Sequence, residues 1–201
     1  MAGGRSYGGM SAEQRTSTRR ASLLESCRTV IGRDGVAAVT VEAVCAESAL
    51  GKRYFYESFP AREDLLLAVA DAFYDGLLDQ LRTTIAGIDP DRRARLVVDV
   101  LVGVLGGDER LARLYVESPG TPVLAARRQR AIEEYTRFVA DEVLPGTARG
   151  KRARARRLLA TRLLVAGTTV LVADWLAGDA EGTQADVVAA ITALGGAVAT
   201  A

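Results

Sequence analysis

The chain has 201 residues, of which 49% are hydrophobic and 25% charged, and its formal net charge is +1. This composition is ordinary for a globular protein that buries a core, and the small net charge excludes a global basic field that would draw the protein onto nucleic acid. The sequence contains no histidine, the residue type that most often serves as general base or metal ligand. No glycine-rich loop follows a strand pattern, and no cysteine pair has metal-ligand spacing. We therefore predict that the protein is not an enzyme and binds neither a metal nor another cofactor.

Residues 1–15 are predicted to form a flexible tail, because they are rich in glycine and serine and lack the apolar segment of a secretion signal. The most apolar run of the chain, residues 158–177, is interrupted by Arg162 and Asp174. Its uninterrupted core, residues 163–173, is about half the length that a bilayer requires. We expect this run to be a long helix buried in protein, and the protein to be cytoplasmic without a membrane partner.

The first predicted helix covers residues 16–34. Its apolar residues recur at helical spacing, and Gly35 is a natural residue to follow its C-terminus. Thr40 is a good N-cap for a second, short helix. The apolar stripe of the first helix consists of Leu23, Leu24, Cys27, Val30 and Ile31.

The most informative stretch is residues 39–66, VTVEAVCAESALGKRYFYESFPAREDLL. It predicts two short helices joined by a turn at Ser48 and Ala49, with Gly51 opening the second. Pro60 then ends the second helix, because the residue before a proline avoids the α region. This is the layout of a helix-turn-helix, whose second helix enters the DNA major groove. In that helix Arg53, Tyr54 and Glu57 are expected to face outward, and Leu50, Phe55 and Phe59 to face inward.

The order and spacing of these residues resemble the TetR family of one-component transcriptional repressors. The family pattern has a threonine-capped second helix, a turn of small residues, a recognition helix ending in aromatic-x-x-Phe, and a Pro-x-basic-acid entry to a long helix. Here SALGKRYFYESF matches the turn and recognition helix, and PAREDLL matches the entry to the fourth helix. The resemblance covers about the first third of the chain. Two positions depart from it: Ala49 stands where glycine is usual, and Gly51 where a capping serine is usual.

Residues that would contact double-stranded operator DNA follow from this register. We expect Thr40, Lys52, Tyr56 and Arg62 to contact phosphates, since most protein–DNA hydrogen bonds go to phosphate and sugar. Lys52 and Tyr56 correspond to a lysine and a tyrosine with which the family binds phosphate. Arg53 and Tyr54 would read bases, with Gly51 allowing close approach of the backbone, and Arg53 has the geometry to bind guanine in a bidentate manner. Arg20 or Arg19 would reach a neighbouring phosphate or the minor groove.

Two features of this segment leave alternatives open. Glu57 could accept from a cytosine amino group or pair with Arg53 one helical turn away, and we favour the pairing slightly. Three tyrosines, Tyr54, Tyr56 and Tyr74, are expected to face solvent, which favours a DNA-binding surface over helices that merely pack.

Behind the head the chain is predicted to be helical throughout, so the fold class is all-α with about nine helices. Three helices form a helix-turn-helix DNA-binding domain over residues 16–60, and six form a second domain over residues 61–201. Glycine and proline residues, including Gly106 and Gly107, break the pattern between helices. The helices of the second domain are expected at residues 62–85, 91–105, 109–117, 122–144, 152–177 and 183–199.

The resemblance implies that the second domain encloses a ligand cavity and that its last two helices pair with a second subunit. A monomer could use the same apolar residues as core, but we favour a homodimer, because one such head rarely binds an operator tightly. The predicted effector is a small, largely apolar or aromatic molecule of unknown identity. Candidate cavity residues are Phe73, Tyr115, Tyr135, Phe138, Thr168 and Trp175.

The sequence thus predicts a DNA-binding transcriptional regulator, a repressor that its effector releases from the operator. The alternative is a helical protein–protein adaptor or small-molecule-binding module without DNA binding. Cys27 and Cys45 fit buried packing in a reducing cytoplasm better than a redox switch, because nothing nearby lowers a thiol pKa. A basic cluster between Arg149 and Arg157 has no assigned role.

Overall fold

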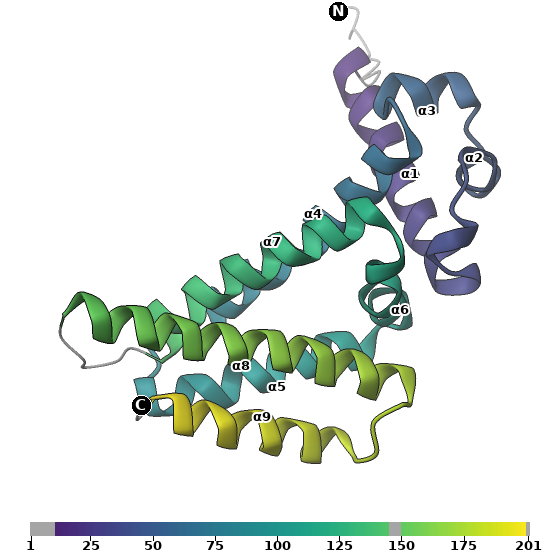
Figure 1. Cartoon of the computed structure of the whole chain (residues 1–201). Coiled ribbons are helices and arrows are strands. Elements are labelled where there is room, and N and C mark those ends of the chain that lie inside the picture. Colours follow the sequence, from purple (N-terminus) through teal and green to yellow (C-terminus); the bar gives the residue numbers. More distant parts are fainter. Residues whose placement is uncertain (1–10, 145–149, 200–201) are drawn as a thin grey trace, which may run out of the picture.

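The computed structural model describes residues 11–144 and 150–199, and within them the chain is all-α, as predicted (Figure 1). The N-terminal head contains α1 (Ala12–Asp34), the short η1 (Val36–Ala38), α2 (Val41–Ser48) and α3 (Lys52–Ser58). The long α4 (Arg62–Ile85) leaves the head and enters the second domain. There it is followed by α5 (Pro90–Gly107), α6 (Glu109–Glu117), η2 (Ser118–Gly120), α7 (Pro122–Phe138), η3 (Val139–Val143), α8 (Lys151–Ala177) and α9 (Gln184–Ala199).

The first helix begins earlier than predicted. The Ser11 hydroxyl accepts from the Gln14 backbone N–H at 3.0 Å, and the Gln14 side chain accepts from the Ser11 backbone N–H at 2.7 Å. This reciprocal capping box starts α1 at Ala12, so residues 12–15 belong to the head and not to a flexible tail. The rest of the predicted tail, residues 1–10, lies outside the described residues.

The head has its own apolar core, where the inward faces of its helices meet. Leu23 of α1, Val44 of α2 and Phe55 of α3 have no exposed surface, and Phe59 is 2% exposed. The ring centroids of Phe55 and Phe59 lie 6.0 Å apart, a favourable separation for an aromatic pair. This core holds α3 against α1 and α2, as the inward-facing pattern predicts.

The turn between α2 and α3 contains the one non-glycine residue with positive φ among those described. Ala49 adopts φ 54° and ψ 27°, the left-handed region that favours glycine. The alanine therefore imposes a small backbone strain there. Gly51, by contrast, has φ −71°, which any residue adopts, so a serine would fit the same N-cap position.

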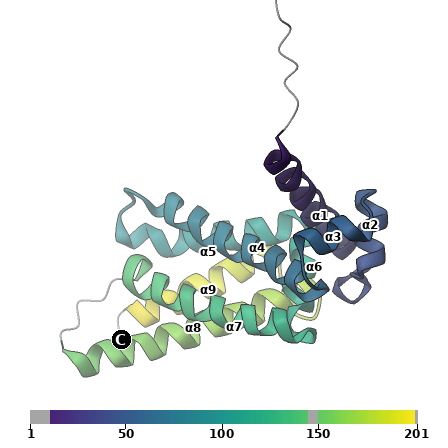
Figure 2. The same cartoon turned by 90° about the horizontal axis from the view of Figure 1, so that it is seen from above.

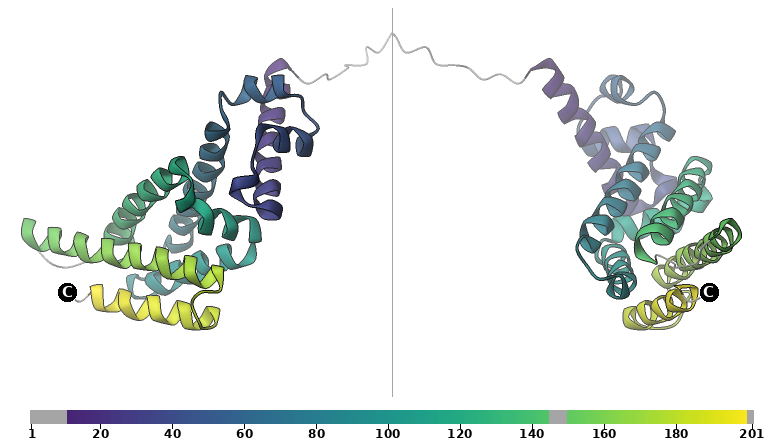
Figure 3. Two further views of the ribbon diagram at one scale, coloured as in Figure 1. Left: turned by 45° about the vertical axis from the view of Figure 1, so that its right-hand side comes forward. Right: turned by 90° about the vertical axis from the view of Figure 1, so that its left-hand side faces the viewer.

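The second domain is a bundle in which each long helix packs against at least two others (Figure 2). α4 packs against α5 and α7, α8 against α7 and α9, and α9 against α5. The views in Figure 3 place α8 and α9 at the side of the bundle farthest from the head. α6 lies between the bundle and α1, where it contacts both α1 and α8.

Two predicted helix ends in this domain are wrong. Gly106 and Gly107 do not break α5, which continues to Gly107. A β-carbon at Gly106 would lie 3.3 Å from Cη2 of Trp175, so the glycine admits the indole ring of α8 against α5. The helix predicted over residues 122–144 becomes a π-helical segment, η3, over its last turn.

The apolar helix α8 is less buried in the chain than predicted. Among the described residues it is the one helix long and apolar enough to cross a bilayer, yet only 17% of its most apolar window is buried. Leu159 and Leu163 are 65% and 75% exposed, and Val170 is 56% exposed. These three side chains share one face, because they lie four and seven residues apart. A single apolar face of this kind also suits a helix that another subunit covers.

Candidate DNA-binding surface and internal cavity

The outward face of α3 presents the side chains that the sequence predicts for DNA contact. The Arg53 side chain is 87% exposed, and Tyr54 and Tyr56 are 38% and 56% exposed. Gly51 is exposed at the N-terminus of α3, with no other protein atom near the position of a β-carbon. The face is therefore accessible to a duplex, with polar and aromatic groups at the positions from which a recognition helix reads a groove.

Ion pairs hold the cationic residues of this face. Lys52 donates to the Glu42 carboxylate of α2, and this partner raises the lysine pKa. Arg53 Nε donates to Glu57 Oε1 at 2.9 Å, which confirms the pairing that was favoured for Glu57. The Arg19 guanidinium lies 4.5 Å from the centroid of the Tyr54 ring. Because these pairs are exposed, each adds little stability, and a phosphate can replace the carboxylate at small cost.

Thr40 and Arg62, two of the predicted phosphate contacts, both form hydrogen bonds within the protein. Thr40 is exposed, and its hydroxyl caps α2 by accepting from the Ala43 N–H at 3.0 Å. Arg62 is half-buried and donates to the carbonyl oxygens of Val36, at 3.0 Å, and Val39. The guanidinium therefore clamps the start of α4 to the loop before α2. Arg62 thus has a structural role in the free protein, and its contact with a phosphate stays a prediction.

Arg20 lies at the surface of the head, whereas Tyr74 is buried in the second domain. The Arg20 guanidinium lies 4.2 Å from the centroid of the Phe59 ring and donates to the Ser58 carbonyl at 3.4 Å. It is exposed at the end of α3, where a flanking phosphate can reach it. Tyr74 does not face solvent as expected: it is 5% exposed and belongs to the second domain's core. Helical periodicity alone misplaced it, because α4 is covered on more than one side.

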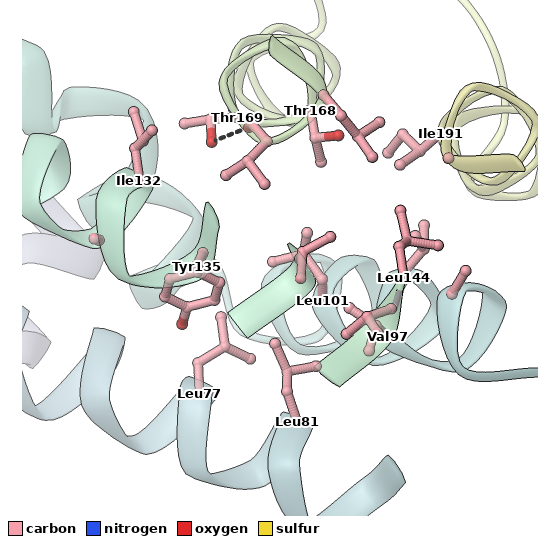
Figure 4. A pocket seen from close by; sticks show the side chains of 18 of the residues that line it. Leu77, Leu81, Val97, Leu101, Ile132, Tyr135, Leu144, Thr168, Thr169 and Ile191 are labelled. Carbon is pink, nitrogen blue, oxygen red and sulfur yellow. Dashed lines mark hydrogen bonds between the residues drawn. The ribbon is translucent and has the colours of Figure 1, made fainter. Parts of the chain in front are cut away.

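The second domain contains a partly open cavity of about 90 Å³, lined by α4, α5, α6, α7, η3, α8 and α9 (Figure 4). Of the predicted cavity residues, Tyr115, Tyr135 and Thr168 line it. Phe73, Phe138 and Trp175 do not; Phe73 and Phe138 are buried in packing beside it, and Trp175 lies against Gly106. Most of the wall consists of aliphatic side chains that sequence periodicity could not separate from ordinary core, among them Leu77, Leu81, Val97, Leu101, Ile132, Leu144 and Ile191.

The polar groups of the wall gather where α4, α6, α7 and α8 meet. Tyr135 donates to the Tyr74 carbonyl at 2.9 Å, and Tyr115 donates to the Thr169 carbonyl at 3.4 Å. Arg128 also donates to the Thr169 carbonyl, at 3.2 Å, and its guanidinium lies 5.2 Å from the centroid of the Tyr115 ring. Burial raises the pKa of Tyr74 to about 12 and raises the pKa values of Tyr115 and Tyr135. All three phenols are therefore protonated near neutral pH.

Helix α6 connects this cavity to the head. Tyr115 faces the cavity from one side of α6. On the other side, Glu117 Oε2 accepts from the Val36 backbone N–H at 2.6 Å, and Arg113 donates to the Arg33 carbonyl at 3.0 Å. Arg110 pairs with Glu25 of α1 at 2.7 Å. Helix α6 thus contacts the cavity on one side and α1 and η1 of the head on the other.

The cysteines have the properties of packing residues. Cys27 is fully buried, and burial raises its pKa to about 12; Cys45 is half-buried, and burial raises its pKa as well. Since the thiolate is the reactive form, only about one Cys27 in ten thousand would be ionised at pH 8. We expect Ellman's reagent to modify Cys45 first and Cys27 only on unfolding. Rapid labelling of both thiols in native Cys45→Ser and Cys27→Ser variants would contradict this and favour a redox role.

The basic cluster at the start of α8 is partly structural. Arg157 donates to the carbonyls of Ala140 and of Leu144, the latter at 3.2 Å. It thus satisfies backbone acceptors at the end of η3. Arg152, Arg154 and Arg156 are exposed, and Arg149 lies outside the described residues.

Residues 23–69 match the family model described as bacterial regulatory proteins, tetR family. The head of this chain is a TetR-family DNA-binding domain. A DNA-binding regulatory role follows from this TetR-family domain, and the matched residues contain the whole of α2 and α3 with the start of α4.

Solved structures extend the similarity in fold to both domains. A transcriptional regulator from Rhodococcus sp. RHA1 is 18% identical with a TM-score of 0.69, covering 89% of this chain and 95% of its own. The multidrug-binding protein EbrR in complex with malachite green is 21% identical with a TM-score of 0.68, covering 88% and 97%. The regulator FadR from Bacillus subtilis in complex with stearoyl-CoA is 17% identical with a TM-score of 0.66, covering 90% and 97%. No curated protein matches the chain.

Proposed function

We propose that the protein is a homodimeric, cytoplasmic repressor that a small apolar or aromatic effector releases from its operator. The observation that carries this proposal is the exposed cationic and aromatic face of α3 on a head connected through α4 and α6 to an internal apolar cavity. EbrR and FadR, which share the fold, are described with small molecules bound, which supports a ligand in the cavity. We place the DNA-binding domain at residues 12–60 and the effector and dimerisation domain at residues 61–201.

The proposed DNA contacts divide into two groups. Lys52, Tyr56 and Thr40 would contact phosphates, with Arg20 at the flank, and these contacts set position and affinity. Arg53 and Tyr54 would read base edges, with Gly51 allowing the backbone to approach. Contact with DNA requires Lys52 and Arg53 to exchange Glu42 and Glu57 for the duplex. The two carboxylates therefore act as internal competitors of DNA.

The proposed dimer covers the exposed apolar face of α8 together with α9. Besides Leu159, Leu163 and Val170, this surface includes Leu194, which is 52% exposed on α9. Exposed small residues on α9, such as Ala190 and Ala193, would allow two copies to approach closely. Twofold pairing here would present two recognition helices to successive major grooves, about 34 Å apart. An effector would release DNA by favouring a conformation in which this spacing is wrong.

Selection of bound fragments from random DNA tests the central claim. We expect a palindromic sequence, because a twofold dimer reads two equal half-sites. If no sequence is enriched and no salt-dependent binding to DNA is observed, the head serves a protein partner, as in the adaptor alternative.

Lys52→Ala tests the phosphate contact at the selected site. We expect the slope of log affinity against log salt concentration to fall by about one unit per subunit, because one released counterion is lost with each phosphate contact. The measurement is a fluorescence-anisotropy titration of the operator at several salt concentrations.

The matched control is Lys151→Ala, since Lys151 is the only other lysine and lies at the start of α8. It should leave the slope unchanged. Glu42→Gln should tighten operator binding by up to about fivefold, because the exposed ion pair that it removes is worth about 0.2–1 kcal/mol. An unchanged slope in Lys52→Ala would remove this residue from the contact set.

A further inference from the structure

One buried hydroxyl in the cavity wall lacks a partner. Tyr74 lines the cavity and is 5% exposed, and no protein group in the described part of the chain bonds its hydroxyl. The Ser118 hydroxyl lies beside that of Tyr74 and lowers the tyrosine pKa, but the two oxygens do not reach hydrogen-bond geometry. The Ser118 hydroxyl itself donates to the Leu114 carbonyl at 2.5 Å. Tyr115 and Tyr135, the other two tyrosines of the wall, both donate to carbonyls. A buried polar group without a partner destabilises a fold and calls for an explanation.

The charge of the wall restricts what can satisfy this hydroxyl. Arg128 is the one charged residue among the described residues that line the cavity, and no carboxylate is present there. Asp71 and Asp75 of α4 are nearby but pair with Arg127, each at 2.5 Å. A cationic ligand would bind weakly, because no group of the wall compensates for the loss of its hydration. A ligand with a neutral or anionic oxygen is compatible with the wall.

The size and shape of the cavity restrict the ligand further. The cavity volume of about 90 Å³ is several times the ~10–15 Å³ that one water needs, but it is smaller than the roughly 150 Å³ of an engineered apolar cavity that binds benzene. The closed part of the cavity therefore holds no more than one ring. The polar end is bounded by three tyrosine rings, Tyr74, Tyr115 and Tyr135. Aromatic rings pack favourably on one another in edge-to-face or offset arrangements. A single aromatic ring matches the wall and is the largest group that the volume admits. Because the cavity is partly open, a short substituent can extend beyond its closed part.

We propose that the cavity binds a compact monocyclic aromatic molecule bearing one oxygen acceptor, a carbonyl or a carboxylate, and that the Tyr74 hydroxyl donates to this oxygen. Arg128 adds to the attraction when the oxygen belongs to a carboxylate. The effect of this ligand on DNA binding rests on the effector function proposed above. Binding of the ligand to the cavity does not depend on that function. Since Tyr74 belongs to α4, which leads directly to the head, the ligand would act on the helix that positions the recognition helices.

Four probes of similar size test the class of ligand, with the full-length protein in isothermal titration calorimetry without DNA. They are acetophenone with a neutral acceptor, benzoate with an anionic acceptor, ethylbenzene with none, and benzylamine with a cation. We expect acetophenone to bind about tenfold more tightly than ethylbenzene, which is the effect of one hydrogen bond, and benzylamine to bind most weakly. Tighter binding of benzoate than of acetophenone identifies a carboxylate ligand, and the reverse order identifies a carbonyl ligand.

Tyr74→Phe tests the donor. The ratio of acetophenone to ethylbenzene affinity should fall to about one, because phenylalanine keeps the ring and loses only the hydroxyl. The unliganded variant should also melt about 2–4 °C higher than wild type, since an unpaired buried hydroxyl has been removed. In Tyr135→Phe, where the lost hydroxyl has a partner at 2.9 Å, we expect the ratio to persist and the melting temperature to fall.

Three results would overturn the proposal: equal binding of acetophenone and ethylbenzene by wild type, tightest binding of benzylamine, or binding of none of the four probes. An unchanged ratio in Tyr74→Phe would likewise remove the tyrosine as donor. Failure of the repressor function would appear differently. DNA selection without ligand would then yield no operator, while the calorimetric results would still stand.

Discussion

Leu163→Glu is expected to convert the protein into a monomer and to abolish specific operator binding. Leu163 is 75% exposed in the single chain, on the α8 face that also carries Leu159 and Val170. In a twofold dimer this face meets its own copy, so one substitution places two unpaired carboxylates in an apolar interface. Operator affinity should fall by about a hundredfold or more toward the non-specific level, since specific binding is typically 10³–10⁷ times tighter. Sedimentation velocity reports the change of mass, and the operator titration reports the affinity.

Ala72→Glu is the matched control for Leu163→Glu. It introduces the same charge at an exposed position of α4, away from α8 and α9. This variant should remain dimeric and fold normally. A dimeric Leu163→Glu variant with unchanged operator affinity would show that the apolar face of α8 is not the interface and would require another surface to pair the heads.

Arg127→Ala is expected to lower the free energy of unfolding by about 2–4 kcal/mol. The Arg127 side chain is only 3% exposed and pairs with Asp71 and Asp75 of α4 at 2.5 Å and with Glu134 of α7 at 3.2 Å. Its guanidinium also lies 5.0 Å from the centroid of the Tyr74 ring. The substitution leaves a cavity and three mutually repelling carboxylates, although their partial exposure, 39–65%, reduces the cost through hydration.

Urea denaturation measures the effect of Arg127→Ala. Arg130→Ala, at an exposed position of the same helix, is the control and should change stability by no more than about 0.5 kcal/mol. Arg127→Lys should recover only part of the loss, because an ammonium cannot reproduce the planar, multidentate contacts of the guanidinium. A loss below about 1 kcal/mol in Arg127→Ala would mean that apolar packing alone holds α7 against α4.

Arg62 has a structural role that the sequence pattern of the DNA-contact residues does not reveal. Arg62 occupies a position from which a cation at a helix start can reach a phosphate, and nothing local in the sequence distinguishes that role from a structural one. Its nitrogens instead bond the Val36 and Val39 carbonyls, which approach it only when α4 folds back on the loop before α2. Lys52 and Arg53, by contrast, lie on a short helix with a single buried face, so periodicity alone predicts their exposure.

Local patterns determined the architecture of this protein. Capping residues, glycines and prolines set nearly every helix boundary, and the helical spacing of apolar residues identified the outward face of α3. Both kinds of signal are readable from the sequence because they depend only on neighbours within four residues. The SAEQ sequence at residues 11–14 is likewise a local signal, because its serine and glutamine form the capping box that starts α1. Tertiary structure alone decided which apolar side chains line a cavity and which merely pack, and it separated Tyr115 and Tyr135 from Phe73, Phe138 and Trp175. It also buried the Tyr74 hydroxyl without a hydrogen-bond partner among the described residues. In the described part of the chain, six α-helices and η3 line the cavity. The distances between them depend on packing across the whole domain, which no local spacing encodes.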